Sequence, residues 1–576
     1  MESTGEDSLI VRSPFADMVK DLNIPNVPYP HFLFKCLRMN QKVLADRAAV
    51  IDAFREKSLM YTDIEPVAIK FASALTKRGF QKGDVFYYIT YNVALLFGLQ
   101  LGVELCGGIV RGCFQQEEPG EVERLMKETK TRFIMCEPDT EKLVKMAAGN
   151  LDWPVNYFSI DGHVDGASPV EEMAFEDDGS AYNKDVVIDP EEDIMFIPST
   201  SGSTGKPKGA LHAHRDMVAL LVGMGAPFDL ERVNWESNTL LGLMGNFSVG
   251  STLVVHNSLV LGDTVILMSS FDKESFFKFF DHYKPTYLAM FVYIANIVTR
   301  SQELESRDVS SVRKLLIGGS VLNPSTVEIL GRKFPNAKLD AMYGMTETLS
   351  ISSNIYCQHY TVTLDPEKEA LCKSKVLNID DESHVSTGVL LPMVEAKVVD
   401  VESGRIVGRR SKGRILVRSP FVMKGYLVPP GIQMWGRDEN GWFNTGDLGF
   451  FDEDGHLYII ERINMVFKYF MHMVSPADIE EVIFRHPSVQ GVGVVGVPDP
   501  ETTSAARAYV VIKPGKSATE DEIKQFVADN LPFCKHLHGG VVFVDSLPES
   551  RGGKLDRAVL LRLAKQEMRS PPQAFK

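Results

Sequence analysis

Cysteine is scarce in this chain, and its pattern excludes two kinds of site. There are seven cysteines in 576 residues, an odd and scattered set with no Cys-x-x-Cys pair. A disulfide framework needs an even, regularly spaced set, and a structural zinc site needs paired ligands. We therefore expect free thiols in a reducing compartment and no zinc site.

Basic charge and long apolar runs are also in short supply. Acidic residues outnumber lysine and arginine by 76 to 61, which gives a net charge of −15 and argues against a nucleic-acid partner. The most apolar window, 94–110, is broken by Gln100, Glu104 and four glycines, so no transmembrane segment is expected. The sequence shows no signal-peptide layout and no C-terminal Ser-Lys-Leu, and we expect a cytoplasmic protein.

One segment is rich in phosphate-binding groups. Residues 198–209 read Pro-Ser-Thr-Ser-Gly-Ser-Thr-Gly-Lys-Pro-Lys-Gly. Glycines let backbone N–H groups approach an anion, hydroxyls donate hydrogen bonds and lysines neutralise charge. The spacing is not that of a Walker loop, because only two residues separate Gly202 from Gly205. A strand over 193–197 and a helix over 211–224 are predicted on either side, although a flexible Ser/Gly loop is the alternative.

A second segment, 343–347, reads Tyr-Gly-Met-Thr-Glu. Thr346 can donate a hydrogen bond to a phosphate. Glu347 can hold Mg²⁺, which prefers a carboxylate together with substrate oxygens. The alternative is a solvated helix start, where the pair Thr-Glu is equally common.

Three more positions suit nucleotide chemistry. Asp447, in Thr-Gly-Asp, can accept hydrogen bonds from ribose hydroxyls, and Arg462 follows a predicted strand and can reach phosphate or ribose. Lys554 lies in Arg-Gly-Gly-Lys-Leu-Asp and can pair with a substrate carboxylate and a phosphate together. Taken singly, each is as well explained by a turn, a surface ion pair or a solvated lysine.

The order of elements predicts an α/β protein of two domains. Up to about residue 450, strand-like runs such as 85–89 and 133–136 alternate with helical patterns such as 64–78 and 92–105. This indicates layered α/β subdomains with mainly parallel sheets. The span 396–427 has short strands and no helix, which suggests a small β subdomain.

The last 115 or so residues read as a compact α+β module. Capping boxes at 475–478 and 519–522 predict helix starts, and strands are expected over 492–497, 508–512 and 541–545. A final helix is expected over 556–567. We predict a large N-terminal domain over 1–461 and a small, mobile C-terminal domain over 465–576.

The five polar segments, taken in order, resemble the adenylate-forming superfamily. It contains acyl- and aryl-CoA synthetases, beetle luciferases and the adenylation domains of peptide synthetases. The resemblance covers about residues 48–563. The tail, with Val-Val-Phe-Val-Asp at 541–545 and Gly-Lys-Leu-Asp at 553–556, is most similar to the branch of luciferases and coumarate-CoA ligases.

This resemblance implies a two-step reaction. A carboxylic acid, fatty or aryl, reacts with ATP to give an acyl-adenylate and pyrophosphate, and the acyl group then passes to coenzyme A with release of AMP. Catalytic roles fall to Thr346 at the α-phosphate, Glu347 at Mg²⁺, Lys554 between the carboxylate and the α-phosphate, and Lys468 on the face that guides the thiol after the small domain rotates. Tyr343 would stack on adenine. The implied nucleotide-binding residues are Ser201, Gly202, Ser203, Thr204, Gly205, Lys208, Gly318, Gly319, Tyr343, Gly344, Asp447 and Arg462.

The departures from the family lie mostly in the second step. Met471 stands where the family usually has a glycine that lets the pantetheine arm pass, and Asn464 stands at the hinge position, where Asp or Lys is usual. Two alternatives follow: an adenylating enzyme that passes the acyl group to another acceptor, and a non-catalytic nucleotide-binding homologue. Residues 243–247 lack the paired histidines of luciferases, which argues against luciferin oxidation. The acid and the oligomeric state stay open.

Overall fold

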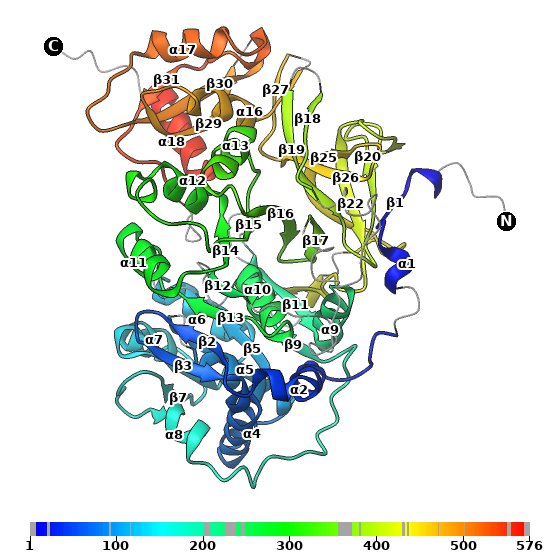
Figure 1. Cartoon of the computed structure of the whole chain (residues 1–576), viewed down its shortest axis with the longest axis vertical. Helices are drawn as coiled ribbons and strands as arrows, with labels where there is room; N and C mark the ends of the chain where they lie inside the picture. The colour runs from blue at the N-terminus through cyan, green and yellow to red at the C-terminus, as the bar shows by residue number, and fades with distance from the viewer. Residues whose placement is uncertain are drawn as a thin grey trace.

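The structure is a computed structural model of the 576-residue chain (Figure 1). Among the described residues, no helix combines the length and apolar character that crossing a membrane requires. The residues described are 7–19, 23–91, 94–113, 115, 117–200, 208–224, 238–242, 248–354, 371, 373–379, 382–428, 432–434, 437–470, 472–499, 501–549 and 555–569.

The first sheet has a parallel half. In spatial order its strands are β16 (Lys338–Met345), β15 (Lys314–Gly318), β14 (Tyr287–Phe291), β12 (Thr239–Gly242), β13 (Thr264–Leu267) and β2 (Ala48–Asp52), with β3 (Lys57–Met60) antiparallel at the edge. The helices that alternate with these strands are α10 (Val249–Val260), α11 (Lys273–Tyr283), α12 (Val292–Arg300) and α13 (Pro324–Lys333). Strand–helix alternation with parallel pairing is what the apolar periodicity predicts.

The same sheet continues into an antiparallel half. Its strands are β17 (Leu349–Ser353), β19 (Glu382–Leu390), β26 (His456–Arg462), β25 (Phe443–Phe451), β22 (Gly413–Arg418), β20 (Glu395–Val399) and β1 (Val11–Arg12), with β18 (Val376–Ile379) and β21 (Ile406–Val407) at the sides. The predicted helix-free β region at 396–427 is therefore part of a larger β subdomain, except for its last residues, which form β23 (Gly425–Val428) of the second sheet.

The second sheet is mixed. Its strands are β24 (Ile432–Met434), β23 (Gly425–Val428), β11 (Lys208–Ala213), β9 (Ile194–Phe196), β5 (Ile109–Gly112), β4 (Val85–Ile89), β6 (Phe133–Cys136), β7 (Asn156–Ser159) and β8 (Ser168–Pro169), and β10 (Ser199–Thr200) pairs with β11. The associated helices are α2 (Tyr29–Met39), α4 (Tyr61–Lys77), α5 (Leu96–Leu105), α6 (Pro119–Glu128), α7 (Glu141–Ala148), α8 (Val170–Phe175) and α9 (His214–Gly223). The predicted helix over 211–224 is wrong in its first turn, because β11 extends to Ala213 through its pairing with β23 and β9.

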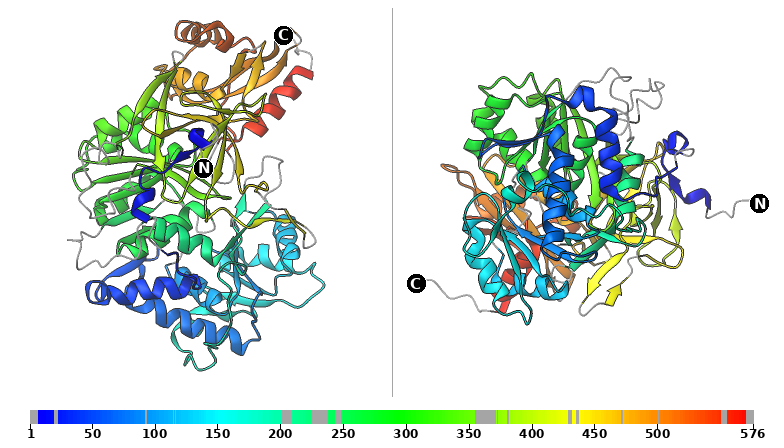
Figure 2. Two further views of the ribbon diagram at one scale, coloured as in Figure 1. Left: turned by 90° about the vertical axis from the view of Figure 1, so that its right-hand side faces the viewer. Right: turned by 90° about the horizontal axis from the view of Figure 1, so that it is seen from below.

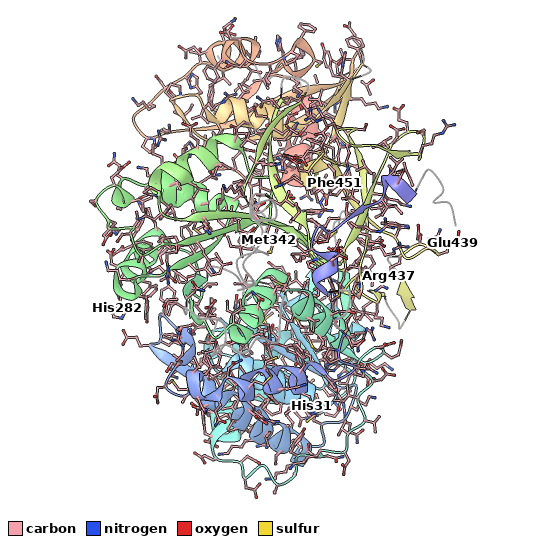
Figure 3. The ribbon with its side chains drawn as sticks, turned by 45° about the vertical axis from the view of Figure 1, so that its right-hand side comes forward. His31, His282, Met342, Arg437, Glu439 and Phe451 are labelled. Carbon is pink, nitrogen blue, oxygen red and sulfur yellow. The ribbon has the colours of Figure 1, made fainter. Side chains whose placement is uncertain are left out.

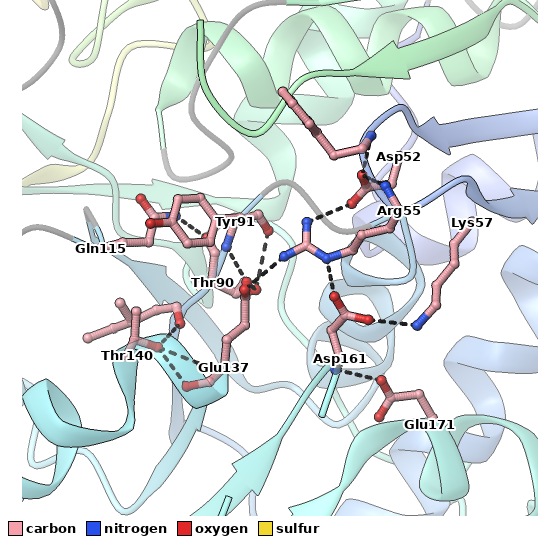
Figure 4. A network of polar contacts seen from close by, with 12 residues as sticks. Asp52, Arg55, Lys57, Thr90, Tyr91, Gln115, Glu137, Thr140, Asp161 and Glu171 are labelled. Carbon is pink, nitrogen blue, oxygen red and sulfur yellow. Dashed lines mark hydrogen bonds and ion pairs between the residues drawn. The ribbon is translucent and has the colours of Figure 1, made fainter. Parts of the chain in front are cut away.

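A polar network joins the two sheets (Figure 4). Arg55, in the turn between β2 and β3, lies 3.1 Å from Asp52 and 2.9 Å from Glu137, and it also pairs with Asp161. Glu137 follows β6, and Asp161 lies two residues beyond the end of β7. Protein side chains therefore fill this part of the carboxyl edge of the second sheet, the edge at which open α/β sheets commonly bind ligands.

The C-terminal module has its own apolar core and lies at one end of the molecule, as the side view in Figure 2 also shows. Its strands are β27 (Phe467–Tyr469), β28 (His472–Val474), β29 (Val489–Asp499), β30 (Thr503–Ile512) and β31 (Val541–Phe543), and its helices are α16 (Pro476–Phe484), α17 (Glu520–Ala528) and α18 (Arg557–Arg569). Thr519 forms its predicted capping box, whereas Ser475 makes no side-chain cap bond. The α/β class with a large N-terminal and a small C-terminal part is confirmed; the boundary at 461–465 and the mobility stay predictions.

Candidate active site

The site is built around the turn that links β16 to β17. The first residues of β16 pair with β15 in parallel, and its end, from Tyr343 to Met345, pairs antiparallel with β17 after a register shift. Gly344 permits this crossing, since a Cβ at that position would lie 2.1 Å from the carbonyl oxygen of Leu349. Thr346 and Glu347 follow directly in the turn. Met342, just before Tyr343, lies near the middle of the molecule (Figure 3).

Asp447 is a buried carboxylate held by two donors. It lies on β25 opposite Arg462 of β26, whose Nε is 3.0 Å from Oδ1, and the Tyr343 hydroxyl donates to Oδ2. Burial raises the pKa of Asp447 to about 6, while the Arg462 guanidinium opposes that rise. Gly446, with φ of +74°, lies within β25 directly before it. A buried, rigidly held acceptor of this kind suits a pair of hydroxyl donors on a ligand.

Glu347 is held by an aromatic hydroxyl that sequence reasoning missed. The Tyr426 hydroxyl, from β23, donates to Oε1 of Glu347 at 2.8 Å, and the backbone N–H of Met423 donates to the Glu347 carbonyl at 2.8 Å. Lys208, at the start of β11, places its Nζ 5.3 Å from the centre of the Tyr426 ring. Burial, followed by the Glu347 charge, raises the pKa of Tyr426, so its hydroxyl stays a proton donor.

These two groups form one electrostatic unit. Burial alone would lower the pKa of Arg462. Electrostatic interactions with Asp447, which has the largest effect, and with Tyr343 and Glu347 raise it instead. Glu347 likewise adds to the rise in the pKa of Asp447, after burial. The structure thus brings together Lys208, Tyr343, Gly344, Thr346, Glu347, Asp447 and Arg462, which the sequence spreads over 255 positions from 208 to 462.

Gly318 ends β15 beside this unit, and Gly319 follows it. A Cβ on Gly318 would lie 3.2 Å from the carbonyl oxygen of Met342, and Gly319 has a φ of +87°, a conformation that favours glycine. Gly318 therefore lets the backbone lie close to β16 just before Tyr343.

Lys468 lies apart from the unit. On β27 its ammonium group pairs at 2.9 Å with Glu402, in the turn between β20 and β21, and both side chains are well exposed.

The remaining predicted residues lie outside the described part of the chain: Ser201, Gly202, Ser203, Thr204, Gly205, Met471 and Lys554.

A described residue that follows Lys554 contacts the N-terminal part. Arg557 lies 3.6 Å from Glu461, the neighbour of Arg462, and 2.6 Å from Glu480 of its own module. The C-terminal side of this segment is therefore joined to the strand that carries Arg462.

The donor set suits Mg²⁺ bound mainly by a nucleotide. Within the described ranges there is no cluster of three or more His, Cys, Asp or Glu side chains that could bind a metal by themselves. Glu347 offers a single carboxylate, and Mg²⁺ commonly takes one or two carboxylates together with substrate phosphates and water.

Comparison with known proteins gives the family. The model of the AMP-binding enzyme family matches residues 37–427, and that of the AMP-binding enzyme C-terminal domain matches 478–554. Luciferin 4-monooxygenase of Nipponoluciola cruciata is 31% identical over 385 residues, 66% of each chain. 4-Coumarate–CoA ligase 2 of Petroselinum crispum is 28% identical over 553 residues, 96% of each chain.

A solved structure shows the same fold. The anthranilate CoA ligase AuaEII, in complex with anthranoyl-AMP, superposes with a TM-score of 0.78 at 21% identity, covering 95% of this chain and 100% of its own. The two family models and this fold together cover most of the chain. The chain is a member of the adenylate-forming superfamily, in the branch that holds the luciferases and the CoA ligases.

Proposed function

We propose that this chain uses ATP to activate a fatty or aryl carboxylic acid and then transfers the acyl group to coenzyme A. The observation that carries the proposal is the joined unit of Tyr343, Asp447, Arg462 and Glu347. It combines an acceptor for ribose hydroxyls, a fixed positive charge and a carboxylate for a metal. The 4-coumarate–CoA ligase relative, aligned over 96% of both chains, supports the CoA step.

In the first step, a carboxylate oxygen of the acid attacks the α-phosphorus of ATP in line. The new bond joins that oxygen to phosphorus, and the bond to the bridging oxygen of pyrophosphate breaks. Asp447 and Arg462 hold the ribose side, Thr346 donates to the α-phosphate, and Lys208 and Lys554 neutralise charge. Mg²⁺ at Glu347 would supply further neutralisation of the phosphates. Positioning and charge stabilisation carry most of such catalysis.

In the second step, the CoA thiolate attacks the acyl carbonyl carbon and AMP leaves with the electron pair of the acyl–oxygen bond. The thiol has by then lost its proton to solvent. Lys468 guides the thiol in this proposal, so it must leave Glu402, where it is paired. A rotation of the C-terminal module about the segment containing Asn464 provides that change.

Pyrophosphate release tests the first step. The full-length protein, ATP, Mg²⁺ and a panel of medium-chain fatty and aromatic acids should release pyrophosphate with at least one acid, and Lys554→Ala should abolish the release. Exposed Lys278→Ala, on α11, serves as the matched control and should keep the wild-type rate. Binding of ATP without pyrophosphate release for any acid would favour the non-catalytic alternative.

A second candidate is an adenylating enzyme whose acceptor is not CoA. It is favoured by Met471 and Asn464, the two positions at which the sequence departs from the family pattern for the second step. If it holds, acyl-AMP accumulates in the presence of CoA, and Met471→Gly raises the thioester yield. A normal rate of acyl-CoA formation by the wild type would exclude it.

The thiols suit a reducing compartment. Among the described cysteines, Cys36, Cys106, Cys113 and Cys136 are buried, and neither they nor Cys534 form a disulfide. Together with the acidic net charge, this supports the proposal of a cytoplasmic enzyme that acts on small molecules.

A further inference from the structure

A buried histidine that the sequence did not single out contacts the Thr346–Glu347 turn. His212 lies on β11 with no exposed surface, and its Nε2 is 2.7 Å from the carbonyl oxygen of Thr346. A carbonyl oxygen can only accept, so Nε2 carries a proton and donates it to this bond.

The imidazole ring is fixed from two further directions. Its Nδ1 lies 3.3 Å from Oδ2 of Asp216, which also accepts from the backbone N–H of Ala213 at 3.1 Å. The ring stacks on Phe196 of β9, with centroids 5.0 Å apart and planes 18° from parallel. Three contacts of different kinds therefore set both the position and the tilt of the ring.

His212 connects parts of the chain that carry different phosphate contacts in the proposed site. β11 follows the Ser/Gly-rich segment in sequence and begins with Lys208, whereas Thr346 and Glu347 lie in the turn between two strands of the first sheet. The partner atoms of the bond are 134 positions apart in sequence. The backbone bond from Lys424 to Leu211 and the bond from Met423 to Glu347 reinforce the same junction.

We propose that His212 is a positioning residue for adenylation: through the Thr346 carbonyl it orients the Thr346–Glu347 peptide unit toward the nucleotide phosphates and their metal. The ring has no exposed surface and bonds to the Thr346 carbonyl, so it acts through Thr346 and not on the substrate. The inference rests on the proposed function. Loss of the donor leaves a carbonyl without its partner and frees the turn to rotate away.

Three substitutions separate the two ring nitrogens. The amide N–H of His212→Gln reaches about as far as Nε2 and should keep the bond to Thr346. The amide of His212→Asn lies near the place of Nδ1 and should keep only the contact with Asp216, and His212→Leu keeps neither. As a matched control, His456→Gln changes a buried histidine bonded to Ser386 Oγ, in the β subdomain.

The experiment measures pyrophosphate release and, by calorimetry, the ATP dissociation constant with Mg²⁺ and with EDTA. We expect His212→Asn and His212→Leu to lower kcat tenfold or more and to reduce the Mg²⁺-dependent gain in ATP affinity at least fivefold. The KM for the acid should change less than threefold. His212→Gln should stay within threefold of wild type in both readouts, and His456→Gln should match wild type.

The outcomes distinguish a failure of the proposed function from a failure of the positioning role of His212. If the wild type neither binds ATP nor releases pyrophosphate, the proposed function fails. If the wild type is active and His212→Asn matches it, or if all three variants lose activity with an unchanged Mg²⁺ effect on ATP binding, the positioning role is overturned. Should His212→Leu not fold, the contrast between the Gln and Asn variants decides alone.

Discussion

At the scale of single residues, Asp447 combines strong burial with a role that needs a negative charge. Its ionised form at neutral pH costs stability, because a pKa raised from 3.8 to about 6 corresponds to roughly 3 kcal/mol. Arg462 and Tyr343 offset part of the cost of burial. A neutral side chain of the same shape would cost less free energy to bury, so the charge at this position is explained by ligand binding and not by stability.

We therefore expect Asp447→Asn to separate binding from stability. The KM for ATP should rise tenfold or more, because one carboxylate acceptor is replaced by an amide N–H. The thermal midpoint at pH 7.5 should stay level or rise, because no charge is buried. Pyrophosphate kinetics and a thermal melt measure the two quantities. Asp281→Asn, at an exposed ion pair with Arg307, should change neither, and a large loss of stability in Asp447→Asn would contradict this account.

The same residue predicts opposite pH trends for binding and stability. As the pH falls below about 6, Asp447 takes up a proton in the native state, and ATP affinity should fall several-fold between pH 7.5 and pH 5. Since the native pKa lies above the unfolded value of 3.8, the stability contribution of this group is complete below pH 4 and is lost as the pH rises through 6. Calorimetric titrations and melts across this range, each compared with Asp447→Asn, isolate the effect. Parallel profiles for the two proteins would refute it.

The resemblance to the adenylate-forming superfamily, carried by the order of the motifs, predicts Tyr343, Thr346, Glu347, Asp447 and Arg462 as parts of one site. The resemblance was not enough for Tyr426, whose contact with Glu347 spans 79 positions, or for His212, whose contact spans 134. A tyrosine or a histidine on a strand carries no local signal of its partner. Only the pairing of β11 with β23, and the fold that brings both to the turn between β16 and β17, gives these side chains their contacts.

At the scale of elements, the crossing from β16 to β17 depends on a missing side chain. Gly344→Ala would place a Cβ 2.1 Å from the Leu349 carbonyl oxygen and 3.0 Å from Ser350 Cα, both backbone atoms that cannot rotate away. We expect adenylation to fall a hundredfold or more and the thermal midpoint to drop by several degrees. Gly331→Ala is the control: it lies inside α13 with nothing within 4 Å, and it should stabilise the helix by about 1 kcal/mol. Equal effects of the two substitutions would contradict the crossing argument.

The bounds of strands with a clear apolar pattern could be predicted closely, whereas the boundary between β11 and α9 could not. The expected strands 85–89 and 133–136 match β4 and β6, since each is a short apolar run at the centre of a sheet. The start of α9 was misplaced because Leu211, His212 and Ala213 fit a helical pattern and include no β-branched residue. Hydrogen bonds to two neighbouring strands, absent from any local signal, make them part of β11.

At the scale of the whole molecule, the contacts between the C-terminal module and the rest differ sharply in burial. Lys535 is almost fully buried and pairs with Glu382 of β19 and, at 2.7 Å, with Asp478 of its own module. Lys468 and Glu402 are joined on an exposed surface. Exposed pairs contribute about 0–1 kcal/mol, whereas breaking a buried pair costs about 3–5 kcal/mol. The Lys535 pair should therefore govern the orientation of the module.

Replacing Glu382 should shift the balance between the two half-reactions. Burial alone would raise the pKa of Glu382, but the hydrogen bond with His384 and the charge of Lys535 lower it to about 2, so it is ionised throughout the working range. In Glu382→Gln the module loses its buried cross-domain partner, and if thioester formation needs rotation, the rate from supplied acyl-AMP and CoA should rise threefold or more. Pyrophosphate release should stay level or fall, because the orientation described here becomes less favoured. Spin labels placed one on each domain should show a broader distance distribution.

The matched variant Glu402→Gln removes only the exposed pair and should change every readout less than twofold. An equal response of the two variants would show that neither contact sets the orientation.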